Sequence, residues 1–151
     1  MFYIIHILAG AVIAKYFPSL WPIIILSLIS HFLIDMIPHK DNLLGEKVSK
    51  INYNVKITKK AFAFDIINSL MGIIIILLIL LKFQNSLMLV GIFFSLLPDM
   101  FKIFYFTAIR NNRIFKNYMH FHSVIQTDTG WFLGILTQAI MAAALIILLL
   151  S

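Results

Sequence analysis

The sequence predicts an all-α fold: a single transmembrane domain over residues 1–151, built as a polytopic membrane bundle of about five transmembrane helices. Hydrophobic residues make up 62% of the chain and charged residues only 12%, a composition far from that of a soluble globular domain. Five long apolar runs alternate with connections that are either short or long and basic. The alternative, a soluble helical bundle with basic loops, fits the length of these runs poorly.

Each apolar run predicts one membrane-spanning helix. The predicted spans cover about residues 2–17, 21–38, 61–82, 87–106 and 130–150. The first run has no positive residue ahead of it, so it makes a poor signal peptide and we expect a retained first span. The segments "PSLWP" and "FQNS" predict tight hairpins between the first two and the middle two spans. The other two connections, residues 39–60 and 107–129, are long and polar.

The basic residues predict the orientation of the bundle. With five spans, the N-terminus and both long connections share one side, and most of the lysines and arginines lie there: Lys40, Lys47, Lys50, Lys56, Lys59, Lys60, Lys102, Arg110, Arg113 and Lys116. Only Lys15 and Lys82 approach the other side. The positive-inside rule therefore predicts that the N-terminus and the long loops are cytoplasmic. Because these loops lack interleaved aromatic residues, we expect them to contact anionic membrane lipid and not nucleic acid.

Ionisable residues gather at one level of the predicted bundle. His6 lies near the start of the first span, His31 and Asp35 near the end of the second, Asp65 near the start of the third and Asp99 near the end of the fourth. All five positions fall on the cytoplasmic side. An aspartate at the centre of a membrane helix costs about 2.5 to 3.5 kcal/mol on insertion scales, so such a group needs compensation.

A divalent cation would neutralise this group of aspartates and use the histidines as further ligands. We therefore expect His6, His31, Asp35, Asp65 and Asp99 to bind one or two metal ions. The chain has no cysteine, which excludes thiolate ligands and disulfides, and mixed histidine and aspartate ligation fits zinc, manganese or iron. One of His120 and His122, in the last long connection, is expected to reach the same site as the general base or acid.

Structural interpretations of the same residues stay open. His6 can serve as a packing residue, and His31 with Asp35 can form a self-satisfied pair one helical turn apart. His39, past Pro38, reads as a loop residue. His120 and His122 point the same way only if the backbone is extended and diverge in a helix.

Four segments carry a resemblance to a known family: "HILAGAVIA", "SHFLIDMIPH", "SLLPDM" and "HFHS". With them the chain resembles the small bacterial and archaeal proteins known as membrane-bound metal-dependent hydrolases. In larger members of that family the Leu-Pro-Asp element tends to precede the Ser-His-Xaa3-Asp element, whereas here it follows. The resemblance implies a multi-pass protein of the prokaryotic plasma membrane. It also implies a metal-site role for His6, His31, Asp35, Asp99 and one of His120 or His122.

These observations lead to one expected function and two alternatives. The expected function is an integral membrane metal-dependent hydrolase that acts at the cytoplasmic face, on a phosphate or ester of a lipid, with a metal-bound water as nucleophile. A transporter of metal ions or protons also uses intramembrane aspartate and histidine. A small structural membrane subunit would use the polar cluster only to fix helix packing. The sequence does not define the oligomeric state.

Overall fold

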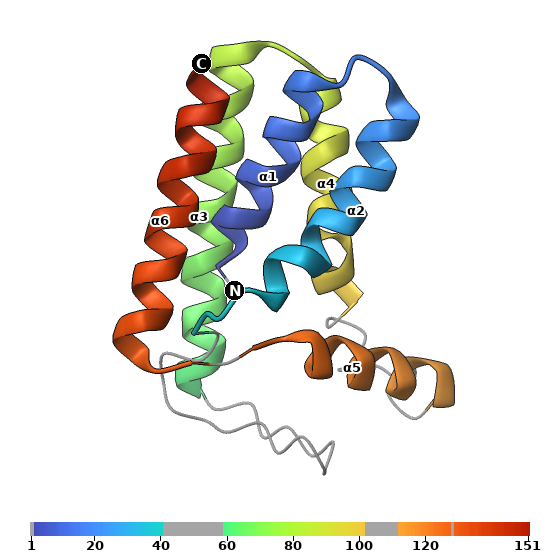
Figure 1. Cartoon of the computed structure of the whole chain (residues 1–151), viewed down its shortest axis with the longest axis vertical. Coiled ribbons are helices and arrows are strands. Elements are labelled where there is room, and N and C mark those ends of the chain that lie inside the picture. The colour runs from blue at the N-terminus through green and yellow to red at the C-terminus, as the bar shows by residue number, and fades with distance from the viewer. Residues whose placement is uncertain (1, 41–58, 102–111, 128) are drawn as a thin grey trace.

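The structure, a computed structural model, is all-α over the residues that it describes, which confirms the predicted class. It describes residues 2–40, 59–101, 112–127 and 129–151, with the backbone only for 59–65 and 123. Six helices follow one another in this part of the chain (Figure 1): α1 Tyr3–Tyr16, α2 Leu20–Met36, α3 Lys59–Phe83, α4 Leu87–Met100, α5 Arg113–Ile125 and α6 Trp131–Leu150.

Two of these helices are long and apolar enough to cross a membrane, so the prediction of about five such helices is wrong in number. The two apolar windows are Ile66–Phe83 in α3 and Trp131–Leu150 in α6, and only 17% of each window is buried inside the molecule. With 20 residues, α6 rises about 30 Å, which matches the hydrocarbon thickness of a bilayer. The other apolar helices have 14 to 17 residues and rise only about 21 to 26 Å.

The shorter helices end where the backbone meets proline. Phe17, just before Pro18, and Ile37, just before Pro38, both adopt extended backbone angles. The residue before a proline is pushed out of the helical region by the proline ring, so α1 and α2 stop there. The predicted continuation of α4, residues 102–106, lies outside the described residues.

The core forms around α1, which packs against α2, α3, α4 and α6. Nearly every side chain from Ile5 to Val12 is buried, so α1 is enclosed by the other helices (Figure 1). The tightest contact joins α1 to α4 at Gly10 and Gly91, where a Cβ atom on either residue would collide with the backbone of the other. Small residues here let the two helix axes approach closely, as they do in membrane proteins.

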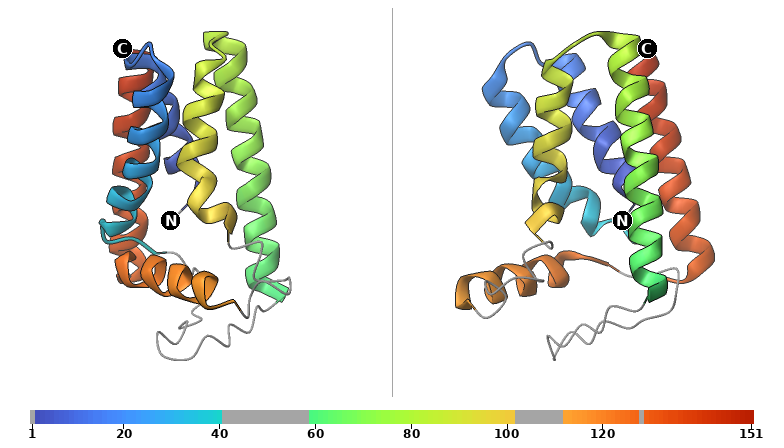
Figure 2. Two further views of the ribbon diagram at one scale, coloured as in Figure 1. Left: turned by 90° about the vertical axis from the view of Figure 1, so that its right-hand side faces the viewer. Right: turned by 180° about the vertical axis from the view of Figure 1, so that it is seen from behind.

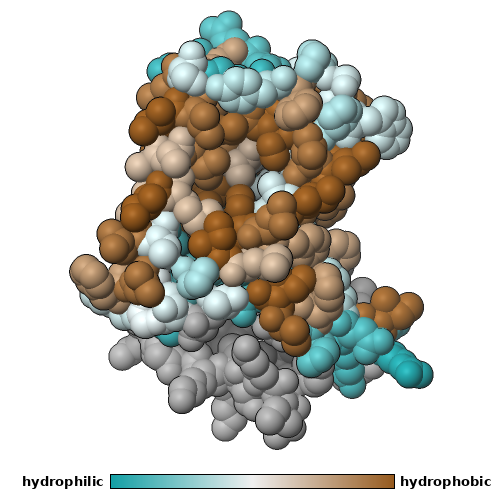
Figure 3. Space-filling view, in the orientation of Figure 1, coloured by the Kyte–Doolittle hydropathy of each residue, from teal (hydrophilic) through white to brown (hydrophobic). Residues whose placement is uncertain are grey.

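The outer surface of the bundle is apolar. Large hydrophobic side chains on the outward sides of α2, α3 and α6 are about half exposed or more. Figure 3 shows a brown, hydrophobic band over the middle of one face, with hydrophilic residues at the upper end. Aromatic residues mark both ends of the band. Trp131 and Phe132 begin α6, while Tyr16 bonds through its hydroxyl to Ser151 and the Leu148 carbonyl at the other end of α6. This distribution is typical of a bilayer-facing surface.

A helix occupies the connection that was predicted to be an irregular loop. Helix α5 lies across the end of the bundle, nearly perpendicular to the other helices, as both views in Figure 2 show. Asn112 caps its first turn by accepting a hydrogen bond from the Ile114 amide at 2.8 Å. The two tight turns, α1 to α2 and α3 to α4, lie at the opposite end of the bundle (Figure 1). One end of the molecule is therefore closed by short turns and the other is covered by α5.

Candidate metal centre

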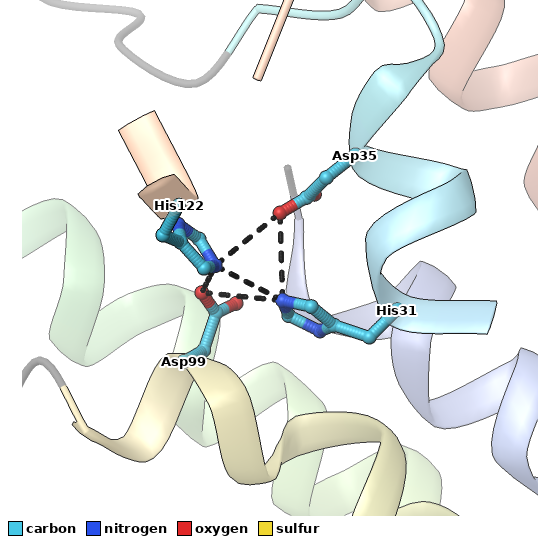
Figure 4. Close-up of side chains that lie close together, drawn as sticks. All are labelled: His31, Asp35, Asp99 and His122. Carbon is cyan, nitrogen blue, oxygen red and sulfur yellow. Dashed lines mark hydrogen bonds and ion pairs between the residues drawn. The ribbon is translucent and has the colours of Figure 1, made fainter. Parts of the chain in front are cut away.

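Four buried side chains from three helices meet where α5 crosses the ends of α2 and α4. His31 and Asp35 come from α2, Asp99 from α4 and His122 from α5 (Figure 4). One nitrogen or oxygen atom from each residue lies within 4.8 Å of the corresponding atom of the other three. None of the four residues is more than 5% exposed. This group, hereafter the four-residue site, can hold a metal ion.

Local helix geometry brings the α2 residues inward. Ser27, His31 and Asp35 repeat at four-residue intervals and are all buried. Ile29 and Leu33, two residues to either side of His31, are about half exposed. Residues four apart share one face of an α-helix, so a single turn of α2 presents both an imidazole and a carboxylate to the interior.

The distances within the site suit one small ion at its centre. His31 Nε2 lies 3.4 Å from Asp35 Oδ2, 3.9 Å from Asp99 Oδ1 and 3.1 Å from His122 Nε2. His122 Nε2 lies 3.6 Å from Asp35 Oδ2 and 3.5 Å from Asp99 Oδ1. Donor atoms bound at about 2.1 Å to a tetrahedral ion lie about 3.4 Å from one another. The site therefore has the dimensions of a first coordination shell.

Hydrogen bonding defines what His31 offers to the site. Its Nδ1 lies 2.8 Å from the Ser95 carbonyl oxygen, and because a carbonyl only accepts, Nδ1 carries the proton. In the neutral ring Nε2 then has a lone pair directed at the other three residues. A proton on His122 Nε2 or a cation between the rings is needed there, because two facing lone pairs at 3.1 Å repel each other. Fixing the tautomer through the distal nitrogen is the usual arrangement for a metal-binding histidine.

The charge of the site also favours a cation. Two carboxylates lie in a region with almost no solvent exposure. Among the described residues no lysine or arginine is buried. Burying carboxylates without a compensating positive charge costs several kcal/mol for each. A divalent ion would supply that charge at the point where the carboxylates converge.

His6 lies behind the four-residue site and outside it. Its Nε2 is 3.3 Å from Oδ1 of Asp35, the oxygen that does not face the other three residues, and its ring stacks on His31 with 4.3 Å between centroids. The ring is fully buried. The Ser95 hydroxyl donates to the His6 carbonyl at 2.7 Å, which ties α4 to α1 at this level. His6 is thus placed to hold the Asp35 carboxylate, and a second ion at His6 stays a prediction.

The structure separates the two candidate catalytic histidines. Both lie on α5, which is a helix and not the loop expected for them. His122 points into the four-residue site (Figure 4), whereas the side chain of His120 is exposed. A spacing of two residues turns a side chain by about 200° around a helix, so only one of the pair can face inward. The side chain of Asp65, on α3, lies outside the described residues.

His39 lies near the site without joining it. Its backbone amide donates to the Thr127 carbonyl at 3.0 Å and its carbonyl accepts from the Thr129 amide at 3.2 Å, as in a β-bridge. The side chain is 1% exposed, and its Nδ1 donates to the Ile37 carbonyl at 2.8 Å. Burial lowers the pKa of His39 to about 4, so this ring is neutral at pH 7.

Three polar contacts at the site have no counterpart in the sequence-based prediction. The side-chain amide of Gln126 donates to Asp35 Oδ2 at 3.2 Å, and the Thr127 amide donates to the Asp35 carbonyl at 3.4 Å. The hydroxyl of Tyr118 donates to the Pro98 carbonyl at 2.7 Å, next to Asp99. These bonds attach α5 to the ends of α2 and α4. Their partners are backbone groups and one carboxylate of distant segments, and no motif in the sequence points to such pairs.

No family model, curated protein or solved structure matches this chain. The resemblance to membrane-bound metal-dependent hydrolases therefore stays a prediction, and the functional argument rests on the geometry of the four-residue site.

Proposed function

We propose that this chain is an integral membrane metalloprotein that binds one divalent ion through His31, Asp35, Asp99 and His122. The observation that carries the proposal is the convergence of two histidines and two carboxylates, at spacings of a first coordination shell, in a buried place. Nitrogen and carboxylate donors without thiolates suit zinc, manganese or iron. Helices α3 and α6 would cross the bilayer. Helices α1, α2 and α4 would lie beside them, between the end of the molecule with the short turns and the metal site.

We further propose that the ion serves hydrolysis of a phosphate or ester of a membrane lipid, at the cytoplasmic face. A metal ion of this kind lowers the pKa of a bound water and polarises the bond under attack. Around it, Asp35 and Asp99 supply the negative charge that retains the ion, and Gln126 and His6 orient Asp35. The site lies next to apolar, bilayer-facing surface on α2, which suits a substrate that arrives from the membrane.

A structural metal site is the second candidate, because each histidine nitrogen lies 3.1 to 3.9 Å from the other and from both carboxylates, close to the spacing in a tetrahedral shell. Structural zinc sites use four protein ligands, whereas catalytic sites keep one position for water. Catalysis at this site requires an ion that accepts more than four ligands, such as manganese or iron, or displacement of one protein ligand by water.

A transport function has less support. In the described residues the buried polar side chains other than Ser27 lie in the half of the bundle nearer α5, which leaves the other half without a polar route.

The test combines metal analysis with an activity screen in lipid nanodiscs. Wild-type protein and a His122→Ala variant are loaded with zinc, manganese or iron and incubated with phospholipid, lysophospholipid and lipid phosphate substrates. His120→Ala is the matched control, because it removes a histidine from the exposed side of the same helix. Hydrolysis that needs the metal and His122 but not His120 supports the hydrolase. Tight metal binding with no turnover of any substrate supports the structural site.

A further inference from the structure

Helix α5 has an exposed surface that the metal site does not use. The helix presents Phe115 and His122 to the interior of the molecule. Its outward side, which carries Arg113, Ile114, Lys116 and Phe121, is exposed, at the end of the bundle where α6 begins with exposed aromatic residues (Figures 1 and 2). If α6 crosses a bilayer, α5 lies parallel to the membrane surface at the level of the lipid headgroups.

The open surface of α5 divides into an apolar flank and a basic flank. Ile114 and Phe121, seven residues apart and so on one side of the helix, are 79% and 53% exposed. Arg113 and Lys116, three residues apart, are exposed on the other flank. Helices that lie in a membrane interface show this division, with apolar side chains toward the acyl chains and basic ones at the lipid phosphates.

The apolar flank continues into the bilayer-facing surface of α2. The Phe121 ring meets the Phe32 ring edge to face, with 5.7 Å between centroids. On the same helix as Phe32, the side chains of Ile29, Leu33 and Met36 are each about half exposed or more. The two surfaces therefore form one continuous apolar area that bends from the side of the bundle onto α5.

We propose that α5 docks in the headgroup layer of a bilayer that contains anionic phospholipid, and that this docking holds His122 in the metal site. Ile114 and Phe121 enter the acyl region, and Arg113 and Lys116 bind lipid phosphates. Because His122 is the only contribution of α5 to the four-residue site, the affinity for metal depends on the position of this helix. The coupling to metal rests on the proposed metal site, whereas the docking of α5 does not.

The coupling has a reciprocal consequence. If anionic lipid favours the docked position of α5, and the docked position favours metal binding, then metal must also favour docking by the same factor. Each basic residue near an anionic surface contributes about fivefold to binding. We expect removal of Arg113 or Lys116 to weaken metal affinity by up to about fivefold, and only in anionic membranes.

The docking is tested by spin labels at single introduced cysteines, since the chain has no native cysteine. Labels at Ile114→Cys and Phe121→Cys are compared with labels at Lys116→Cys and His120→Cys, on the other flank, in nanodiscs that contain anionic lipid. We expect labels at 114 and 121 to collide with oxygen, which concentrates in the bilayer, and labels at 116 and 120 to collide with a water-soluble nickel chelate. Equal access of the nickel chelate to all four labels would overturn the docking.

The coupling is tested by zinc titration in nanodiscs with and without anionic lipid. We expect tighter binding with anionic lipid for the wild-type protein, loss of that difference in Arg113→Gln with Lys116→Gln, and its retention in Arg113→Lys with Lys116→Arg. Zinc affinity that is independent of lipid charge would overturn the coupling. If zinc fails to bind in every membrane, the proposed metal site and the coupling fail, while the spin labels still decide whether α5 docks.

Discussion

At the scale of single residues, His6 has a role that the metal ligands alone do not reveal. Its Nε2 is 3.3 Å from the Asp35 oxygen that faces away from His31 and His122. An imidazole this close to Oδ1 holds the carboxylate in place and leaves Oδ2 for the ion. Groups that orient a metal ligand in this way commonly contribute 10- to 100-fold, as an approximate range, to metal affinity.

We therefore predict that His6→Ala weakens metal binding by about 10- to 100-fold without abolishing it. His6→Gln, which keeps a donor of similar length, should recover part of the loss. Competition with a chelator of known affinity measures both values. An unchanged affinity in His6→Ala would show that His6 only fills space, and complete loss of binding would place it among the ligands.

The lowered pKa of His39 makes the stability of the protein depend on pH. Its pKa is lowered from about 6.5 to about 4 in the folded protein, so the unfolded chain binds a proton more readily than the folded one. The stabilisation from its neutral, buried ring is complete above about pH 6.5 and is lost as the pH falls toward 4. In the metal-free protein, His39→Asn should show a smaller loss of stability between pH 7 and pH 5, measured by denaturant unfolding in detergent. Parallel curves for the two proteins would contradict this role.

Part of the site was predictable from single residues. The four-residue interval between His31 and Asp35 and the common depth of Asp99 point to one cluster in the sequence itself. The choice between His120 and His122 depends on the backbone of α5, and the sequence reading left it open for that reason. Gln126 has no such signal, because its partner is a carboxylate 91 residues away.

At the scale of helices, the contact between α1 and α4 sets the spacing of the elements that carry the site. Gly10 and Gly91 bring the two backbones together, and this places Ser95 against His6 and against the ring of His31. An added methyl group at either glycine would meet backbone atoms, which cannot move aside as a flexible side chain can. Overpacking of this kind typically costs about 1 to 3 kcal/mol.

We predict that Gly91→Ala lowers the free energy of unfolding by about 1 to 3 kcal/mol. The same substitution should also lower the affinity for metal. Gly130→Ala is the control, since no atom outside its chain neighbours lies within 4 Å of the added Cβ. Thermal unfolding in detergent, followed by circular dichroism, measures the difference. Equal stability of the two variants would show that α1 and α4 do not pack as closely as described.

The apolar helices were predictable and α5 was not, for a physical reason. Long hydrophobic runs indicate helices whatever their surroundings, and α1, α2, α3 and α6 begin and end within two residues of the predicted bounds. In α5 basic and polar residues alternate with aromatic ones, so its mean hydropathy is unremarkable and only its helical periodicity marks it. The seven-residue spacing of Phe115 and His122 and the capping residue Asn112 were the features of the sequence that indicated a helix here.

At the scale of the whole molecule, three short helices meet the site at their lower ends. The last turns of α2 and α4 and the first turn of α1 reach the same level, and α5 covers them from below (Figure 1). The long helices α3 and α6 continue past this level. Counting apolar runs overestimated the number of spans, because it accepted runs that form helices of only 14 to 17 residues, which rise about 21 to 26 Å. The arrangement encloses a buried polar site between the ends of the short helices and α5.

X-ray absorption spectroscopy of the metal-loaded protein in lipid nanodiscs, together with elemental analysis, tests the central claim most directly. We predict one ion per chain, bound by two imidazole nitrogens and by carboxylate oxygens at about 2.0 to 2.2 Å. The same spectrum should persist in His120→Ala and disappear, with the bound metal, in Asp99→Ala. A folded protein that takes up no metal, or a bound ion whose spectrum shows no histidine, would contradict the account.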